Sequence, residues 1–156
     1  SSKVSFFRLK HYPPISEWSS VLAIPDVTFI NLQYSDWADD LAGIKKNIGV
    51  TVHKFDDLDQ YNNVDDVAAL CAALDAVVST KVTPLIFSSG VGTPTKVANW
   101  RQSPWNHVLT NPVCSSVEMF HRDTWEPWDT VFDLIAEDIS KLKNTTNLNT
   151  KDILKG

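Results

Sequence analysis

Cysteine is scarce in this sequence, since Cys71 and Cys114 are the only two in 156 residues. Two thiols are too few for a zinc site built on cysteine, and a single disulfide is unusual in a reducing compartment. Cys71 also falls on the apolar stripe of an expected helix, where a small hydrophobic residue belongs. We therefore expect two free thiols and no cysteine-based metal centre.

Long apolar runs and an excess of positive charge are missing too. No stretch reaches the roughly 18 consecutive apolar residues of a membrane span, and the opening SSKVSFFRLK lacks the apolar core and cleavage site of a secretion signal. The net charge of -5 repels phosphate at long range, which argues against nucleic acid and anionic membranes as partners. The sequence predicts a cytoplasmic protein without a membrane span, in which local groups must hold any bound phosphate.

The common catalytic motifs are absent as well. The four histidines form no H-x-x-x-H pair, and there is no G-x-S-x-G segment. The run Gly90-Val91-Gly92 looks like the start of a dinucleotide fingerprint, but it follows an expected helix and precedes an expected strand, which is the wrong context. These absences argue against zinc hydrolases, serine hydrolases and dinucleotide-binding enzymes.

An acidic loop offers a weak metal motif. The pair Asp57 and Asp59 forms a D-x-D, which can hold Mg²⁺ beneath a diphosphate. Such a triplet arises easily by chance in an acidic loop, and Asp65 and Asp66 are better explained by the positive end of the helix that follows. We expect neither a metal site nor a cofactor.

What the sequence does contain is an alternation of short β-rich runs and helical patterns. Such alternation predicts an α/β fold, a three-layer Rossmann-like parallel sheet of about six strands with helices on both faces. We expect one domain at 1–143 and a polar, loosely attached tail at 144–156. The expected strands are 3–9, 27–32, 50–55, 76–79, 95–99 and 116–120.

Several helix ends carry recognisable signals. Gly49 is a natural C-cap, and Asn63 can cap the next helix with Asp66 three residues further on. A last helix is expected at about 127–143. The residues expected on the buried faces are Trp18, Val21 and Leu22 in the first helix, Trp37, Leu41, Ile44 and Ile48 in the second, and Val64, Val67, Ala68, Cys71 and Leu74 in the third.

The strongest candidate for chemistry is the turn from Ser79 to Pro84. In open α/β sheets ligands bind at the carboxyl ends of the strands, and this turn follows an expected strand. Pro84 suits the first helical position and Thr83 the N-cap, so backbone N–H groups, hydroxyls and Lys81 together would form an anion site. The alternative is that Thr83 merely caps the helix and Lys81 is a solvated surface charge.

The six tryptophans form a second unusual feature, because four of them fall in the last third of the chain. Aromatic faces bind sugar rings and bases, but the commonest fate of tryptophan is partial burial in a core. We expect core packing for most of these residues, which are Trp18, Trp37, Trp100, Trp105, Trp125 and Trp128.

Several segments, taken in order, resemble a known family. They are VTFINLQYSD, VDDVAALCAALDAVVST, the G-x-P at Gly92, NWRQSPWNHV and VEMFHRDTWEPW. Together they resemble the glycosyltransferase domain found behind tetratricopeptide repeats in bacteria, a group similar to the family 9 heptosyltransferases and, more distantly, to O-linked N-acetylglucosamine transferases. The resemblance covers roughly residues 3–142.

The resemblance implies the C-terminal, nucleotide-binding half of a GT-B type glycosyltransferase. In that half a nucleotide-sugar lies at the strand ends as substrate and needs no metal. Gln33 and Tyr34 would line the nucleotide pocket, and Asp36 or Asp39 would meet the ribose. The turn containing Ser79, Thr80, Lys81 and Thr83 would hold the pyrophosphate, with Trp100 and Arg101 at the border of the site.

The chain departs from this family in two ways. The family carries D-T-x-x-x-H after the strand, where this chain has Lys81, Val82 and Ile86. The other GT-B half, which supplies the acceptor site and a catalytic base, is also missing from this sequence, so transfer would require a second domain or a tetratricopeptide-repeat partner. The alternative is a non-catalytic protein-interaction module that keeps the fold but has lost the ligand, and no residue stands out as a catalytic base.

Overall fold

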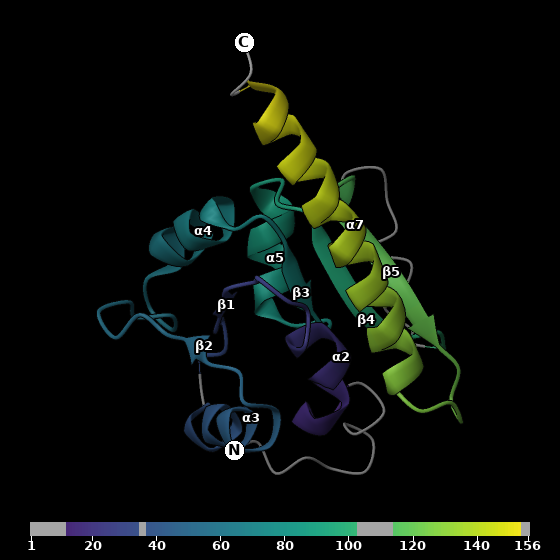
Figure 1. Ribbon diagram of the computed structural model, residues 1–156. Helices are drawn as coiled ribbons and strands as arrows, with labels where there is room; N and C mark the ends of the chain where they lie inside the picture. The colour runs from purple at the N-terminus through teal and green to yellow at the C-terminus, as the bar shows by residue number, and fades with distance from the viewer. Residues whose placement is uncertain (1–11, 35–36, 103–113, 154–156) are drawn as a thin grey trace.

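The computed structural model in Figure 1 describes residues 12–34, 37–102 and 114–153. Its strands lie in two parallel sheets, which confirms the α/β class and the parallel pairing. The described strands are fewer than the six predicted, and the run predicted as a strand at 3–9 lies outside the described residues. The strands are β1 (Phe29–Ile30) paired with β2 (Val52–His53), and β3 (Val77–Ser79), β4 (Thr95–Trp100) and β5 (Val117–Arg122) in the order β3-β4-β5.

Helices connect these strands as the alternation predicts. Gly49 adopts a left-handed φ of 80° at the end of α3, a conformation that glycine reaches without a steric penalty. The helices are α2 (Ser19–Leu22), preceded by the 3-10 turn η1 (Ile15–Trp18), then α3 (Ala38–Ile48), α4 (Val64–Ala73), α5 (Thr83–Gly90) and α7 (Asp129–Ile153).

The start of α4 confirms the predicted cap and corrects one buried position. The side-chain oxygen of Asn63 accepts a hydrogen bond from the Asp66 backbone N–H at 3.3 Å. Val67 and Cys71 are buried as expected, whereas Val64 is 51% exposed, so its predicted burial is wrong. A first-turn residue has helical neighbours on one side only, and helical periodicity alone therefore does not ensure its burial.

The last helix is longer than predicted. It continues to Ile153, ten residues beyond the expected end at 143, so the segment expected to be a loose tail is largely helical. This segment is polar, but residues 144–153 contain neither glycine nor proline, the two residue types that most strongly end a helix.

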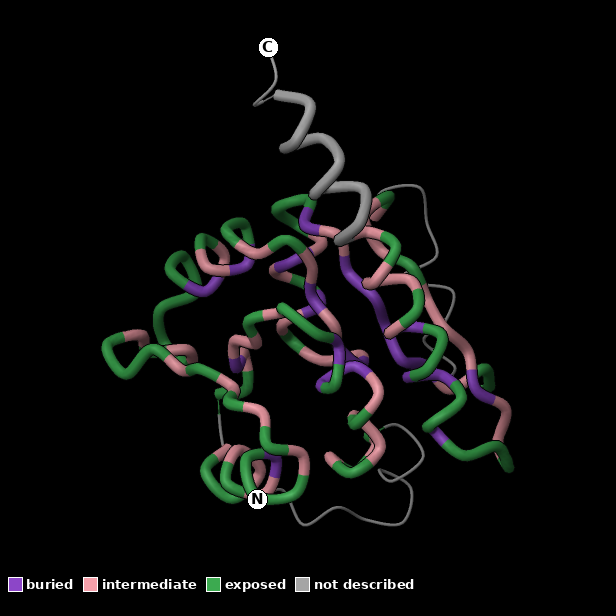
Figure 2. Tube along the Cα trace, viewed as in Figure 1, coloured by how far each residue is buried: buried purple, intermediate pink, exposed green. Residues whose placement is uncertain are grey.

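Strand β4 is covered on both faces, as Figure 2 shows by its continuous buried colour. On one face Lys96 forms an ion pair with Asp138 of α7, at 2.6 Å, and Ala98 joins the main core. On the other face Thr95 donates a hydrogen bond to Ser88 of α5, at 2.8 Å. Because successive side chains of a strand point to opposite faces, α7 and α5 must cover opposite faces of this sheet.

The main core lies between α2, α7 and this sheet. Trp18 packs against Phe132 with ring centroids 4.6 Å apart, and Val21 is 2% exposed, in agreement with the predicted inward face of the first helix. The buried members of this core are Val21, Ile24, Ala98, Trp128, Val131, Phe132 and Ile135.

The tryptophans have mixed environments. Trp128 is buried under the Arg122 guanidinium, which lies 4.1 Å from its ring centroid, while Trp37 lies beneath the Lys54 ammonium at 4.6 Å. Trp125 is 94% exposed and departs from the expected core packing. Trp105 lies outside the described residues.

Both cysteines are free thiols, as predicted. Cys71 is buried, and its burial raises the pKa of the thiol, which keeps it neutral. Across the described ranges, no helix combines the length and the apolar character that crossing a membrane requires.

The core predicts a clear stability difference between two positions of α7. Phe132→Ala should lower the free energy of unfolding by about 3–5 kcal/mol, because it opens a cavity beneath Trp18. Leu134→Ala, on the same helix but 49% exposed, should change it by less than about 0.5 kcal/mol. Urea denaturation followed by circular dichroism measures both, and similar losses in the two variants would contradict this placement of the core.

Candidate functional site

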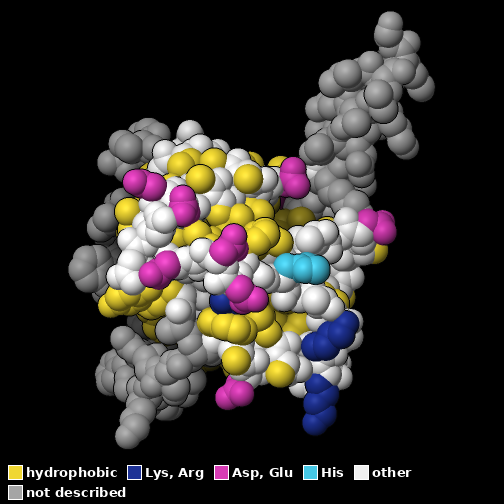
Figure 3. All heavy atoms as spheres, turned by 90° about the vertical axis from the view of Figure 1, so that its left-hand side faces the viewer, with side chains coloured by type: hydrophobic (Ala, Val, Ile, Leu, Met, Phe, Trp, Pro, Cys, Tyr) yellow, Lys and Arg dark blue, Asp and Glu magenta, His cyan; other side chains and the backbone are white. Residues whose placement is uncertain are grey.

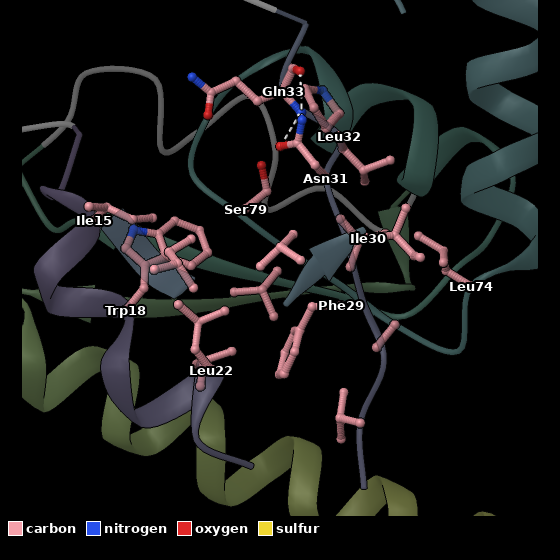
Figure 4. A pocket seen from close by; sticks show the side chains of 18 of the residues that line it. Ile15, Trp18, Leu22, Phe29, Ile30, Asn31, Leu32, Gln33, Leu74 and Ser79 are labelled. Atoms are coloured by element: carbon pink, nitrogen blue, oxygen red, sulfur yellow. Dashed lines mark hydrogen bonds between the residues drawn. The ribbon is translucent and has the colours of Figure 1, made fainter. Parts of the chain in front are cut away.

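A cavity of about 980 Å³ lies between β1 and β3. Its body is lined by apolar side chains such as Trp18, Leu22 and Phe29 (Figure 4). At the carboxyl ends of the two strands the lining is polar, with Asn31, Gln33 and Tyr34 after β1 and with Ser79 and Thr80 at the end of β3. Further polar residues line the cavity from before the strands and from α3, among them Asp26, Thr28, Asp75 and Asp40. The carboxyl edge is where ligands bind in open α/β sheets.

Asn31 fixes the shape of the chain after β1. Its side chain accepts a hydrogen bond from the Gln33 N–H and donates one to the Gln33 carbonyl, both at 3.1 Å. The Asn31 carbonyl accepts a third bond from the Gln60 side chain at 2.7 Å. An asparagine side chain that bonds the backbone two residues further on holds a tight turn. The turn that carries Gln33 is therefore fixed by the Asn31 side chain and by the bond from Gln60.

Two tyrosines form an exposed aromatic pair beside this turn. The rings of Tyr34 and Tyr61 lie 5.7 Å apart at 56°, and the two residues are 48% and 73% exposed. Acidic side chains are spread among exposed apolar ones over the face formed by α3 and α4 (Figure 3). The two exposed tyrosine rings form a solvent-facing apolar surface at the cavity edge, of the kind that stacks on a planar base.

The turn after β3 differs in detail from the prediction. Ser79 and Thr80 are only 5% and 6% exposed, so their hydroxyls are not displayed on an open loop. Val82, in extended conformation at φ -134° and ψ 172°, takes the N-cap position of α5, and Thr83 is an exposed first helical residue without a capping bond. The predicted Thr83 cap is wrong because the chain enters the helix one residue earlier, after the Val82 N–H bonds the Thr80 carbonyl at 2.8 Å.

Side chains at the ends of β4 and β5 complete this edge. Asn99 lies opposite His121 in the β4–β5 register, and its Nδ2 is 3.0 Å from the His121 Nδ1. This distance allows a hydrogen bond between the amide and the imidazole, whose donor and acceptor roles follow the His121 tautomer. At the end of β4 the Trp100 indole donates to Thr124 at 3.0 Å, and the next residue, Arg101, donates to Asp123 at 3.0 Å.

The positive charges of Arg101 and Lys81 act on the imidazole of His121 at this edge. We call Lys81 and Arg101, together with the imidazole of His121, the cationic cluster. Burial, followed by the charges of Arg101 and Lys81, lowers the pKa of His121, against a smaller opposite effect of Asp123. Burial also lowers the pKa of Lys81. These effects favour the neutral imidazole, so the positive charge of the cluster comes from Lys81 and from Arg101, which is paired with Asp123.

The structure separates the residues singled out from the sequence into two groups. Gln33, Tyr34, Ser79 and Thr80 line the cavity, whereas Lys81, Trp100 and Arg101 do not. Lys81 and Arg101 belong instead to the cationic cluster. Asp39 is exposed on the first turn of α3 and does not line the cavity, whereas its neighbour Asp40 does. Asp36 lies outside the described residues.

Three residues of this edge were not identified from the sequence. His121 has a usable signal, since it follows the apolar run of an expected strand and parallel pairing places it near the end of that strand. Asn31 also ends an expected strand and is a residue type that favours turns. Tyr61 has no comparable signal, because its ring contact with Tyr34 joins two loops distant in sequence.

The second aspartate of the D-x-D, Asp59, has a structural role. Asp59 accepts hydrogen bonds from the backbone N–H groups of Tyr61 and Asn62, both at 3.0 Å, and from the Asn62 side chain at 2.8 Å. The Asn62 side-chain bond, followed by the backbone bonds, lowers the pKa of Asp59. Within the described part of the chain, no group of three or more His, Cys, Asp or Glu side chains is arranged to hold a metal ion.

The chain is similar to a longer protein. Over 138 residues, which make up 87% of this chain, it is 32% identical to Protein FlbA of Caulobacter vibrioides (strain ATCC 19089 / CIP 103742 / CB 15). It spans only 23% of the length of that relative. No family model and no solved structure matches the chain.

The environment of His121 predicts a pH effect. Its folded pKa lies below the unfolded value of 6.5, so its contribution to stability is present above 6.5 and lost as the pH falls through the folded pKa. His121→Gln should therefore flatten the fall in unfolding free energy on acidification from about pH 7.5 to pH 5. Chemical denaturation at several pH values measures this slope, and an NMR titration giving His121 a pKa above 6.5 would contradict the placement.

Proposed function

We propose that this domain binds a nucleotide-sugar as the donor half of a glycosyltransferase-like protein of the cytoplasm. The observation that carries the proposal is the joint placement, along one edge of parallel strands, of an exposed aromatic pair, a polar-lined cavity and a cationic cluster. A nucleoside diphosphate sugar offers the matching parts, which are a planar base, hydroxyl-rich sugars and a diphosphate.

The aromatic pair is suited to the base. Tyr34 lines the cavity and contacts Tyr61. Because every base has a flat face that can stack on an exposed tyrosine, the pair would hold the base without selecting which base is bound. The Asn31–Gln33 turn presents polar groups beside it for the ribose hydroxyls.

The cationic cluster is suited to the diphosphate. Lys81 is the second residue after β3, and the eight-residue helix α5 begins two residues later with its positive end at the same edge. Lys81 is partly desolvated, so a bound anion would supply favourable charge interactions that water does not. The diphosphate is thus neutralised by side chains and by the helix end, and binding needs no metal.

Transfer itself requires more protein than this domain. An acceptor site and a catalytic base must come from a second GT-B half or from a tetratricopeptide-repeat partner, since a single half does not close around its substrate. The match to a stretch covering 23% of FlbA supports a domain that works beside other segments.

Nucleotide binding is tested first by thermal unfolding. The chain is heated with UDP, ADP, GDP, CMP and their common sugar conjugates, each with and without Mg²⁺. A ligand that binds only the folded state must raise the melting temperature. We expect a rise with one nucleotide that Mg²⁺ does not alter, and no rise with any of them would reject the donor-site proposal.

Lys81→Ala then locates the ligand within the fold. Loss of one charge-assisted hydrogen bond should weaken affinity by about 1.5–3 kcal/mol, roughly 10- to 150-fold in Kd by calorimetry. Lys46→Ala, which removes an exposed lysine from the last turn of α3, is the matched control and should leave Kd unchanged. Equal affinities of the Lys81 variant and the unaltered chain would remove Lys81 from the site.

A second candidate function rests on Trp125. This residue is 94% exposed in the turn between β5 and α7, and exposed tryptophans are enriched among residues that anchor protein interfaces. Together with Lys81 and Ile86 in place of the expected aspartate and histidine, it favours a protein-interaction module that associates with a second copy of this chain.

Sedimentation separates the two candidates. The interaction module predicts a concentration-dependent dimer that Trp125→Ser abolishes, and no thermal shift with nucleotides. A monomer at all concentrations that binds a nucleotide tightly would count against the module.

A further inference from the structure

The cavity lies between the edges of the two described sheets. At the cavity each sheet ends in a strand, β1 or β3, that pairs with a described strand on one side only. Among the described strands β1 pairs with β2 alone, and β3 pairs with β4 but with nothing on its other side. Residues of both β1 and β3 line the cavity. The cavity therefore lies where a continuous sheet would have one more strand.

The backbone of these strands has groups directed toward the gap. The Val77 N–H donates to the Pro94 carbonyl on the β4 side, at 2.8 Å. Alternate residues of a strand direct their N–H and C=O groups to opposite edges, so those of Val78 are directed away from β4. By the same alternation, Asn31 bonds His53 of β2 at 2.7 Å and Ile30 is directed away from β2. Half-buried backbone groups of this kind normally find partners.

The side chains around the gap favour a strand over a soluble ligand. Beneath the polar mouth the walls are apolar and come from β1, β3, α2 and α7, among them Leu22, Phe29, Val78 and Ile139. A cavity of about 980 Å³ also lies at the upper end of the roughly 300–1,000 Å³ that ligand sites occupy. An apolar slot bordered by two rows of backbone hydrogen-bonding groups has the shape of a missing central strand.

We propose that residues 3–9, KVSFFRL, occupy this slot as a parallel strand and join the two sheets. The segment is close at hand, because Tyr12, the first described residue, already lines the cavity. Its run of Val4, Phe6, Phe7 and Leu9 is mostly apolar, as expected for a strand covered on both faces. At seven residues it is about as long as β4 and β5.

Chain topology favours the same position. With 3–9 in the slot, the order across the sheet becomes β2, β1, 3–9, β3, β4, β5. The chain first runs outward through α2 to β1 and α3 to β2, and then returns past the slot through α4 to β3. This reversal of direction at the central strand is the doubly wound arrangement, in which each crossover can keep the right-handed sense.

The inserted strand fills the apolar body of the cavity and leaves the polar mouth open. The ligand site is then the crevice at the carboxyl edge, bordered by Asn31, Gln33, Ser79 and Thr80, and no longer the whole cavity. The inference concerns the sheet alone, so it stands or fails independently of nucleotide binding.

Hydrogen exchange of the unaltered chain, followed by mass spectrometry, is the first test. Peptides covering 3–9 should be protected to the same degree as those covering Thr95–Trp100 of β4, because a central strand opens only with the whole sheet. Exchange of 3–9 at the rate of an unstructured peptide would overturn the proposal.

Cysteine pairs then test the position of the segment. In a background of Cys71→Ser and Cys114→Ser, single cysteines at positions 4–9 are combined with Ile30→Cys on one side of the slot or Val78→Cys on the other. A disulfide needs Cα atoms within about 7 Å, so neighbouring strands allow it and distant ones do not. We expect intramolecular disulfides to both sides, and none to the control Glu118→Cys on β5, which is separated from the slot by β3 and β4.

Other outcomes of this experiment are equally decisive. Disulfides to one side only would mean that the segment extends one sheet without joining the two. Disulfides that appear only between chains, as a dimer on a non-reducing gel, would place a second copy in the slot. Either result rejects the proposal, even where the hydrogen exchange shows protection.

Discussion

The burial of both faces of β4, under α7 and α5, is the constraint on which the rest of the structure depends. Its Lys96 is 8% exposed and would be costly to bury alone, but it forms ion pairs with Glu118 of β5 at 2.7 Å and Asp138 of α7 at 2.6 Å. Burial lowers the pKa of this lysine while the two carboxylates raise it, and the net effect is a raised pKa. Because one side chain must satisfy partners on two elements, it restricts both the β4–β5 register and the placement of α7.

That register decides what meets at the carboxyl edge. Parallel pairing of β3, β4 and β5 brings the charges of Lys81 and Arg101 within electrostatic reach of His121, although the three residues are separated by 20 residues or more in the sequence. At the end of β5, Arg122 lies over Trp128 and donates to the Glu126 carbonyl at 2.8 Å, which fixes the turn into α7. The packing that covers β4 and the charges of the candidate site therefore belong to one arrangement.

Several features followed from local sequence alone, and others did not. The cap at Asn63, the left-handed Gly49 and the inward Val21 were predictable because each depends on residues within one or two helical turns. The end of α7 was not predictable, because residues 144–153 are mostly weak helix formers, which neither stop a helix nor require it to continue. The start of α5 was shifted by one residue through the bond from Val82 to Thr80, which propensity does not reveal.

The sequence by itself determined the alternation of strands and helices, the α/β class and the turn after β3 as a place to look for an anion site. These follow from apolar periodicity and from residues with restricted backbone preferences, both of which act over a few residues. Only the tertiary structure decided that Ser79 and Thr80 are buried, that Tyr61 joins Tyr34 and that His121 lies beside Asn99. Such contacts depend on strand order and register, because which distant residues become neighbours is a property of the whole packed sheet.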